Sequence, residues 1–328
     1  MKNKIYYIKE FDAPGAQQLF QGQIETLFDK NRFLSVQYPQ GTLSKLLFLL
    51  KFFFKVRKSD ILFFIHPLYS KTNRLILNLS LFKKCNVVCI VSDINSLRNI
   101  EMKVDEEISY WKKIRYFIFQ NDKMKSFVEA KVGEKVSVNI QLFDLLFTLP
   151  KANRKNSNEI VFAGNTLKCP FVKDLFRVND IKWNIYSGTE VQLHPNVTPV
   201  LLSNGVTDRQ TLPGSYGLVW EGKSITDISN FNGQYLKWVS PLKLSNYLLN
   251  SLPVIIHEDA AMAEFVVQNK IGFCVSSLFE IGEKIKVIPE ADYQQMVENA
   301  RGFSIEISSG YYTQKAIEGI LEKINPPE

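Results

Sequence analysis

The feature of this sequence that most narrows its fold is an alternation of short apolar runs with helical patterns in both halves of the chain. In the first half the expected strands are 4–8, 33–37, 61–65, 86–91, 115–119 and 136–140, and the expected helices are 16–28, 43–56, 72–82, 106–113 and 122–131. In the second half the expected strands are 159–163, 183–186, 217–220, 253–257 and 272–275. Such alternation is typical of parallel sheets joined by helices. We therefore predict an α/β protein with two doubly wound, Rossmann-like domains that face each other across a cleft.

The length and one polar segment predict where the domains divide. A chain of 328 residues fits two domains of about 150 residues each. The stretch 151–158 is polar, with three Asn, two Lys and one Arg, so we expect domains at 1–152 and 153–306. Residues 291–324 have the pattern of two helices broken at Ser308-Ser309-Gly310. The last segment, 307–328, is expected to cross back to the first domain.

The net charge of +7 is divided unevenly along the chain. Residues 1–155 contain 26 Lys and Arg against 14 Asp and Glu, a net charge of +12, whereas residues 156–328 contain 14 against 19, a net charge of −5. A basic half indicates an acidic partner, such as nucleic acid, an anionic membrane surface or a phosphate-bearing substrate. Because the basic residues are spread over several helices and not interleaved with aromatic residues, nucleic acid is disfavoured.

The cysteines and the N-terminal sequence predict a cytoplasmic protein. Cys85, Cys89, Cys169 and Cys274 form no CxxC pair and have no His at metal-ligand spacing, so we expect reduced core thiols. The first residues lack the apolar core of a signal peptide, and no run reaches the ~18 apolar residues that a membrane span needs.

Residues 240–249 have the pattern of a helix with a positively charged start. Ser240 is a typical N-cap, and Pro241 suits the first helical position, where a missing N–H costs nothing. Lys243 then falls in the first turn, where the helix dipole is already positive, and this combination suits a bound phosphate. With a strand on each side, the segment fits a nucleotide-diphosphate site in a parallel sheet. The alternative is an ordinary βαβ unit with a solvated lysine.

Ligand-facing loops of a parallel sheet follow the carboxyl ends of its strands, and polar residues stand at these positions in both halves. In the first half they are Asp12, Gly15, His66, Ser92, Asp93 and Arg98. In the second half they are Gly164, Asn165, Ser187 and Gly188, while Gly214 precedes the strand that ends at Trp220. Alternatively, Asp93 is a helix N-cap and His66 a packed core histidine.

The segment 43–58 consists almost entirely of Leu, Phe, Lys and Arg. At 100° per residue, a helix would place Lys45, Lys51, Lys55 and Lys58 on one side, beside a wide apolar face. This pattern is typical of a helix that lies in a membrane interface. The alternative is a core helix whose apolar surplus packs on the sheet or on another subunit.

The nucleotide site expected here is not that of an NTPase or a dehydrogenase, because the sequence has no GxxxxGK[ST] and no GxGxxG motif. A nucleoside diphosphate would place its base near residues 186–188 and its phosphates at Lys243. Together with a carboxylate in the basic half, this site predicts a group-transfer enzyme with a nucleotide-activated donor. The competing class is a non-catalytic anion- or nucleic-acid-binding protein.

Several longer motifs resemble those of the GT-B glycosyltransferases of bacterial polysaccharide and glycoprotein assembly, most closely the β-1,6-galactofuranosyltransferases of lipopolysaccharide O-antigen synthesis. They are Asp12-Ala13-x-Gly15, Ser92-Asp93-Ile94-x-x-Leu97-Arg98, Ala163-Gly164-Asn165, Leu212-Pro213-Gly214-x-x-Gly217-Leu218-Val219-Trp220, Gly233-x-Tyr235-Leu236-Lys237, Pro241-x-Lys243 and Leu252-Pro253-Val254. The resemblance spans nearly the whole chain. The chain departs from it at Ser92, where the galactofuranosyltransferases have His, and it lacks the two glutamates eight residues apart of the general GT-B pattern.

The resemblance implies inverting transfer of a hexose, best matched by galactofuranose, from a UDP-sugar to a glycan acceptor. The alternative is a UDP-glucose-dependent glucosyltransferase that acts on a glycoprotein. Asp93 would be the general base, with His66 and Asp12 as substitutes, and Gly15 and Arg98 would bind the acceptor. The donor would contact Gly164, Asn165, Ser187, Gly188, Gly214, Trp220, Tyr235, Ser240 and Lys243. No DxD-like pair is present, so we expect no metal and no other cofactor. A lipid-linked acceptor, peripheral attachment to an anionic membrane surface and a homo-oligomer are further expectations.

Overall fold

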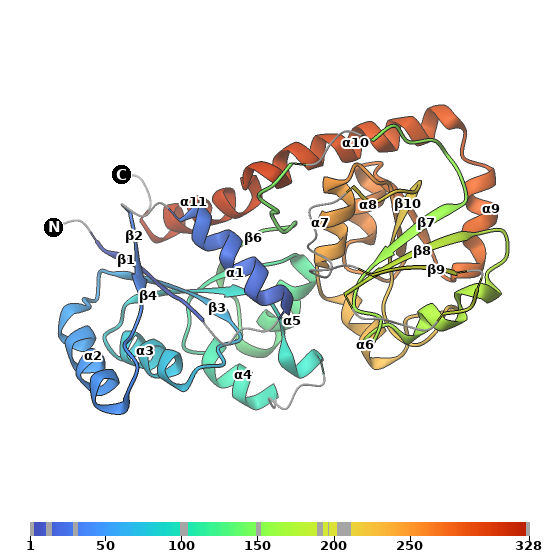
Figure 1. Cartoon of the computed structure of the whole chain (residues 1–328). Coiled ribbons are helices and arrows are strands. Elements are labelled where there is room, and N and C mark those ends of the chain that lie inside the picture. Colours follow the sequence, from blue (N-terminus) through green and yellow to red (C-terminus); the bar gives the residue numbers. More distant parts are fainter. Residues whose placement is uncertain are drawn as a thin grey trace. The chain divides into compact units, whose positions relative to one another are not determined.

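The chain folds into two compact units, each built around one parallel sheet (Figure 1). The computed structural model describes residues 3–10, 15–28, 32–98, 104–148, 152–188, 193–195, 197–201 and 211–325. One unit comprises Met1–Gln141 together with Tyr312–Glu328, and the other comprises Leu142–Tyr311. The predicted α/β class, with two doubly wound parallel sheets, is confirmed.

The first sheet has six strands in the order β2-β1-β3-β4-β5-β6, all parallel. The strands are β1 (Ile5–Ile8), β2 (Phe33–Val36), β3 (Ile61–His66), β4 (Asn86–Val91), β5 (Tyr116–Phe119) and β6 (Val136–Asn139). The helices of this unit are α1 (Gly15–Leu27), α2 (Thr42–Lys55), α3 (Lys71–Phe82), α4 (Val104–Trp111), α5 (Asp122–Val132) and α11 (Tyr311–Ile324), with a short 3₁₀ turn η1 (Asn95–Leu97). Every residue of β3 is buried, as expected for a central strand covered on both faces.

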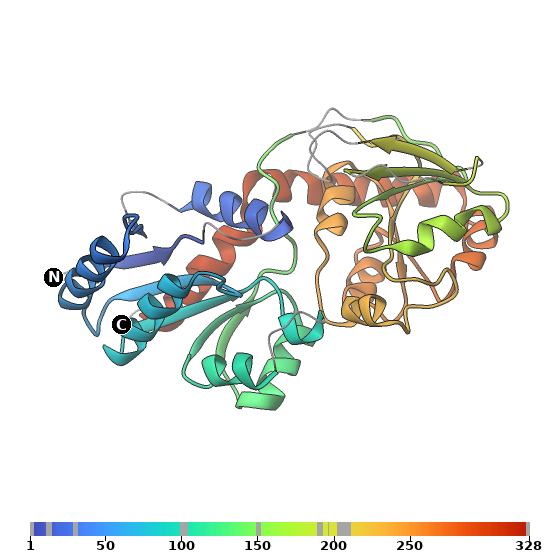
Figure 2. The same ribbon diagram turned by 60° about the horizontal axis from the view of Figure 1, so that its bottom comes forward.

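The second sheet also has six parallel strands, in the order β12-β11-β10-β7-β8-β9 (Figure 2). The strands are β7 (Glu159–Ala163), β8 (Lys182–Ser187), β9 (Val197–Leu201), β10 (Tyr216–Val219), β11 (Val254–His257) and β12 (Gly272–Val275). The helices are η2 (Pro170–Arg177), α6 (Phe231–Gln234), η4 (Tyr235–Lys237), α7 (Leu242–Leu249), α8 (Ala263–Gln268), η5 (Leu278–Glu280), α9 (Ile281–Lys286) and α10 (Glu290–Ser309). Strand β9 was not predicted, because Pro199 interrupts its pattern. Its edge position tolerates the missing N–H.

Each sheet has one point at which the strand order reverses. In the first sheet the chain runs from β1 outward to β2 and then to β3 on the other side of β1. In the second sheet it runs from β7 through β8 to β9 and then returns to β10, on the other side of β7. Ligands of open α/β sheets bind at such switch points, beyond the carboxyl ends of the strands.

The division between the units lies at Gln141 and Leu142, before the polar stretch 151–158. Residues just after this point already belong to the second unit, because the Phe143 N–H donates to Ser245 Oγ (3.0 Å) and the Leu145 N–H to the Ile307 carbonyl (3.2 Å). The predicted break between the last two helices is confirmed. It lies at Gly310, whose left-handed φ of 81° ends α10. None of the described helices combines the length and apolar character needed to cross a membrane.

Candidate active site

A buried lysine lies at the switch point of the second sheet. Lys243, in the first turn of α7, is 8% exposed. Its ammonium donates to the Trp220 carbonyl oxygen (3.2 Å) and pairs with Glu221 Oε1 (2.9 Å), and it lies 5.0 Å from the centre of the Phe162 ring. Trp220 and Glu221 follow β10, and Phe162 is in β7, so the ammonium lies where the strand order reverses.

The Lys243–Glu221 pair keeps the lysine charged. Burial alone would lower the pKa of Lys243, but the Glu221 carboxylate and other neighbours outweigh this effect and hold the pKa well above its ordinary value. Glu221 is 28% exposed, so the pair reaches solvent on the carboxylate side. A fixed positive charge at this edge is suited to an anionic ligand.

The loop after β7 approaches the same lysine. The Gly164 N–H donates to the Tyr186 carbonyl oxygen (2.9 Å). A Cβ at Gly164 would lie 2.9 Å from Phe162 Cζ and 3.7 Å from Lys243 Cε, so a side chain here would crowd the ring and approach the lysine. Asn165 is exposed and its Oδ1 accepts the Leu167 N–H (2.9 Å), which shapes the turn. Gly164 and Asn165 therefore lie at the same edge of the second sheet as Lys243, which we call the donor edge because the donor was predicted to bind there.

The end of β8 supplies the next two predicted donor residues. Ser187 is buried and shares a hydrogen bond with Thr166 of the β7 loop (Oγ to Oγ1, 3.1 Å), and Gly188 is exposed. Because β8 is the neighbour of β7, both residues lie at the edge that holds Gly164.

Three other predicted donor residues lie elsewhere or use their side chains differently. Gly214 precedes β10, at the opposite edge of the sheet, since a four-residue strand spans about 13 Å. There its φ is +125°, and its carbonyl oxygen accepts from Arg154 Nη1 (2.6 Å). The Trp220 side chain is fully buried, and its indole N–H donates to the Ser224 carbonyl oxygen (2.8 Å). Tyr235 is buried in η4.

Ser240 is not the N-cap of α7, so that prediction was wrong. Pro241 has an extended conformation (φ −72°, ψ 137°), and the helix begins at Leu242. The Ser240 hydroxyl is instead buried, 3.1 Å from Met262 Sδ. The displacement by one residue leaves Lys243 in the first turn, so its position relative to the helix dipole is retained.

Sequence reasoning missed two further residues at this edge. Glu221 directly follows the predicted strand 217–220, and His257 ends the predicted strand 253–257, so the strand-end rule could have found both. The His257 ring lies 5.1 Å from the Trp220 ring, and its Nδ1 accepts the Asp259 N–H (3.0 Å). Burial lowers the pKa of His257, so the neutral ring is favoured.

In the first sheet, the structure brings the predicted base and an acceptor residue together. Asp93 Oδ2 and Arg98 Nη1 form an ion pair at 2.6 Å after β4, and both side chains are partly exposed. Tyr69, after β3, belongs to the same region. Burial, and then the negative charge of Asp93, raise the pKa of its phenol. Asp93 is not the N-cap of the turn that follows it, because the N-cap of η1 is Ile94.

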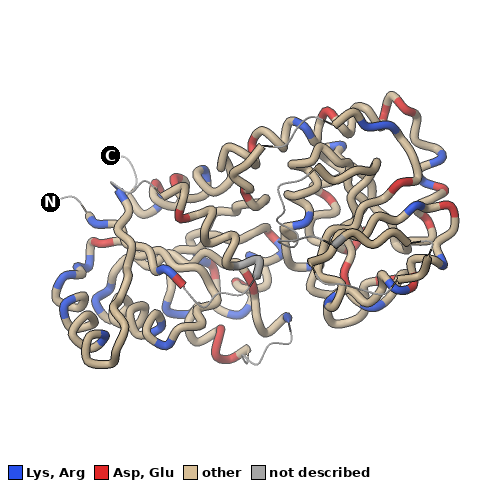
Figure 3. The backbone as a smooth tube through the Cα atoms, in the orientation of Figure 1, with Lys and Arg blue, Asp and Glu red and all other residues tan. Residues whose placement is uncertain are grey.

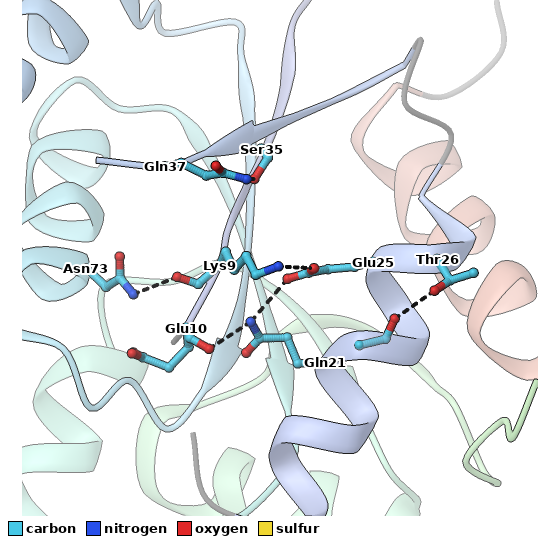
Figure 4. Close-up of polar contacts among 9 residues, drawn as sticks. Lys9, Glu10, Gln21, Glu25, Thr26, Ser35, Gln37 and Asn73 are labelled. Atoms are coloured by element: carbon cyan, nitrogen blue, oxygen red, sulfur yellow. Dashed lines mark hydrogen bonds and ion pairs between the residues drawn. The ribbon is translucent and has the colours of Figure 1, made fainter. Parts of the chain in front are cut away.

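The switch point of this sheet is occupied by Glu10, which sequence reasoning missed. Glu10 is buried, and its Oε2 accepts the N–H groups of Tyr69 (3.0 Å) and Ser70 (3.1 Å) at the start of α3. Figure 4 shows the surrounding contacts, in which Gln21 donates to the Glu10 carbonyl oxygen (2.9 Å). Asp12 lies outside the described residues, and Gly15 is the first residue of α1.

His66 is a buried, partnered side chain. Its Nε2 lies 3.1 Å from Glu107 Oε1, and its ring contacts that of Trp111 edge-on. Glu107, which sequence reasoning missed, also accepts the N–H groups of Asn95 (2.8 Å) and Ser96 (3.0 Å). Burial alone would raise the pKa of Glu107, but the His66 contact and these hydrogen bonds lower it. This pair supports the turn after Asp93, and His66 itself is not presented to an acceptor.

In the part of the chain that the structure describes, no group of three or more His, Cys, Asp or Glu side chains is placed to hold a metal ion.

Comparisons with known proteins agree with this arrangement. The family model described as "Glucosyltransferase 3-like, N-terminal domain" matches residues 6–141, and "Glucosyltransferase 3-like, C-terminal domain" matches residues 160–320. The chain is 27% identical over 283 residues to the beta-1,6-galactofuranosyltransferase WbbI of Escherichia coli (strain K12), covering 82% of this chain and 81% of the relative. It is 26% identical over 282 residues to glucosyltransferase 3 of Streptococcus parasanguinis, with the same coverage.

The fold comparison includes a solved structure described as trehalose-6-phosphate from Escherichia coli bound with UDP-2-fluoro glucose. Its TM-score is 0.54 at 8% identity, covering 97% of this chain and 99% of that one. The two parallel sheets, taken with these matches, define a glycosyltransferase with the GT-B fold. The chain belongs to the glucosyltransferase 3-like family. The non-catalytic binding protein considered as the competing class is therefore excluded.

Proposed function

We propose that this glycosyltransferase transfers a hexosyl group, with galactofuranose as the first candidate, from a UDP-sugar to a glycan acceptor in bacterial polysaccharide synthesis. The observation that carries the donor assignment is the buried Lys243 ammonium at the switch point of the second sheet. The 27% identity with a galactofuranosyltransferase over 82% of the chain supports the choice of sugar. A cytoplasmic location and a homo-oligomer stay predictions.

The donor diphosphate would lie at the carboxyl edge of β7 and β10. There Lys243 supplies a charge that Glu221 keeps protonated, and the start of α7 adds the positive end of a helix dipole. Gly164 supports this assignment because its backbone comes close to the lysine: a Cβ at this position would lie 3.7 Å from Lys243 Cε. As the leaving group departs, its developing negative charge would be stabilised by Lys243 and by polar groups of this edge rather than by a metal.

The acceptor would be activated in the first unit. Asp93 is partly exposed, and Arg98 fixes its orientation through the 2.6 Å ion pair. In an inverting transfer, Asp93 takes the proton of the acceptor hydroxyl while that oxygen forms a bond to the anomeric carbon. The bond from the anomeric carbon to the UDP oxygen breaks from the opposite face, and UDP leaves with the electron pair.

A glucosyltransferase that uses UDP-glucose is the second candidate function. It is favoured by the 26% identity with glucosyltransferase 3 of Streptococcus parasanguinis. A panel of UDP-sugars, including UDP-galactofuranose and UDP-glucose, separates the two candidates by hydrolysis or transfer. Turnover of UDP-glucose alone would replace galactofuranose with glucose as the assigned sugar.

The role of each site can be tested with paired variants. Lys243→Met should weaken UDP binding about tenfold or more, because a charge-assisted phosphate contact contributes about 1.5–3 kcal/mol. Lys182→Met is the matched control, since Lys182 also forms an ion pair (2.6 Å to Glu159) but at the start of β8, on the opposite edge. UDP affinity is measured by calorimetry. Equal affinity of the Lys243 variant and the control would contradict the donor assignment.

The role of Asp93 as the general base is tested separately. Asp93→Asn should lower transfer about 10²- to 10⁴-fold while leaving UDP binding intact. Asp105→Asn, an exposed carboxylate in the first turn of α4, is the control and should keep normal turnover. Near-normal transfer by Asp93→Asn would move the base to another residue, and Asp12 would be the next candidate.

A further inference from the structure

Helix α2 presents a large apolar surface to solvent. Its exposed apolar residues recur at helical spacing on one side, and their side chains are 49–79% exposed: Leu43, Leu46, Leu47, Leu50 and Phe54. We call these five residues the α2 apolar face. Phe82, at the end of α3, is also exposed and extends it, since the Phe53 ring lies 6.2 Å from the Phe82 ring and 5.5 Å from the Phe54 ring.

The α2 apolar face is not needed to attach the helix to its sheet. The opposite side of α2 makes that attachment through Phe52, which is buried and contacts the Tyr6 ring at 5.9 Å and the Phe48 ring at 6.2 Å. Surface patches of this kind mark sites that bind a partner. The five exposed side chains are therefore a surplus that the fold of this unit does not use.

The charged residues in the stretch of sequence that contains α2 are all basic. Lys51 and Lys55 are exposed on α2, Lys58 is exposed just beyond its end, and no Asp or Glu occurs between residues 30 and 59 of the sequence. On the α3 side, Lys83 lies 4.6 Å from the centre of the Phe53 ring. In Figure 3 helix α2 is tan with blue positions and has no red ones. Lys45 is partly buried, and its ammonium lies 5.5 Å from the centre of the Tyr38 ring.

We propose that the α2 apolar face and its lysines dock the protein on an anionic membrane surface. Apolar side chains bordered by lysine suit the boundary between acyl chains and negatively charged headgroups. A second copy of the chain fits this surface less well. A two-fold contact would bring the lysine rims of both copies together, and like charges across an interface are unfavourable. The inference rests on the proposed function, because docking would give the enzyme access to a lipid-linked glycan acceptor.

The test is flotation of the full chain with vesicles. We expect co-flotation with vesicles that contain phosphatidylglycerol, little with pure phosphatidylcholine, and a loss of binding as salt rises. Lys51→Glu/Lys55→Glu should weaken binding at least about tenfold, since each basic residue near the surface contributes to attraction. Phe54→Ser should also weaken it, because it removes an inserted ring. UDP binding, measured in parallel, should not change in either variant.

The control for the charge change is Lys123→Glu/Lys131→Glu on α5, which alters the net charge equally but leaves α2 intact. Equal loss of flotation in this control, or no flotation with anionic vesicles, would overturn the proposal. So would an oligomer, measured by sedimentation, that Phe54→Ser dissociates, because the face would then be covered by another copy. Failure of flotation with normal UDP binding would reject docking alone, whereas an absence of UDP-sugar turnover by the unmodified protein would reject the proposed function.

Discussion

At the scale of single residues, two buried bases at the donor edge have pKa values shifted in opposite directions, although burial lowers the pKa of both. Lys243 keeps its charge because the Glu221 carboxylate lies 2.9 Å away and offsets the cost of desolvation. At His257, whose Nδ1 accepts the Asp259 N–H, burial is the largest effect, and the carboxylates of Asp259 and Glu258 do not outweigh it. Burial therefore favours its neutral ring, and the pKa of His257 is lowered. The same edge thus combines a fixed cation with an uncharged imidazole.

The lowered pKa of His257 predicts a loss of stability in mild acid. Below the ordinary value of 6.5 the unfolded chain binds a proton that the folded chain does not, so the free energy of unfolding falls as pH falls through this range. His257→Asn retains a hydrogen-bond acceptor but cannot titrate. Between pH 7.5 and 5.5 its melting temperature should therefore fall less than that of the unmodified protein. Identical slopes in thermal denaturation would contradict this assignment.

At the scale of elements, the contact between α7 and the second sheet positions Lys243. The Tyr247 hydroxyl accepts the Ala163 N–H (2.9 Å) and donates to the Leu218 carbonyl oxygen (3.0 Å), so it joins β7 to β10 at the switch point. The Tyr247 ring lies against Gly217, where a Cβ would be only 2.3 Å from its nearest atom. The glycine is therefore required for the close approach of the helix.

Gly217→Ala should push α7 away from the sheet and lower the free energy of unfolding by about 1–3 kcal/mol, the usual cost of overpacking. UDP affinity should fall as well, because Lys243 moves with the helix. Gly302→Ala in α10 is the control: no atom lies within 4 Å of its Cβ, and it should stabilise by about 0.5–1 kcal/mol. Urea denaturation measures the free energy of unfolding of both variants. A Gly217 variant as stable as the control would show that the helix does not depend on this contact.

At the scale of the whole molecule, the first unit is completed by a helix from the far end of the sequence. Helix α11 belongs to the unit of residues 1–141 and buries a stripe of apolar side chains that includes Ile317, Ile320 and Leu321. An ion pair between Glu318 and Arg32 (2.7 Å) joins it to the segment before β2. A Cβ on Gly319 would lie 3.5 Å from Val138 of β6. The unit is therefore continuous in space but not in sequence.

A fragment of residues 1–141 should be markedly less stable than the same fragment joined by a flexible linker to residues 311–325. Each of the buried side chains of α11 contributes about 1.5–3 kcal/mol when it leaves water. The urea midpoint should rise on addition of the helix. An Ile317→Asp/Ile320→Asp version of the fused helix serves as the control and should not restore stability. Equal midpoints with and without α11 would show that the first sheet is stable alone.

The sequence alone was enough to predict the elements. All strands except β9, and the helices whose bounds were predicted, were found within one to two residues, because the periodicity of buried positions, the turns and the caps are properties of neighbouring residues. Gly310 marks the end of α10 for the same local reason. The candidate residues Asp93, Arg98, Gly164 and Lys243 were also recognisable, since each stands at a strand end or in the first turn of a helix.

Only the tertiary structure decided which of these residues meet. The ion pair of Lys243 with Glu221 and that of His66 with Glu107 join residues 22 and 41 positions apart, and neither spacing has a local signature. Because β7 and β10 are parallel, Gly214, which precedes β10, lies at the edge opposite Gly164, which follows β7. The order of strands, with β3 beside β1, also brings Glu10 to the start of α3. Strand order and helix packing are set by contacts distant in the sequence, so the pattern along the chain predicts candidates, while the sheet determines which of them form a site.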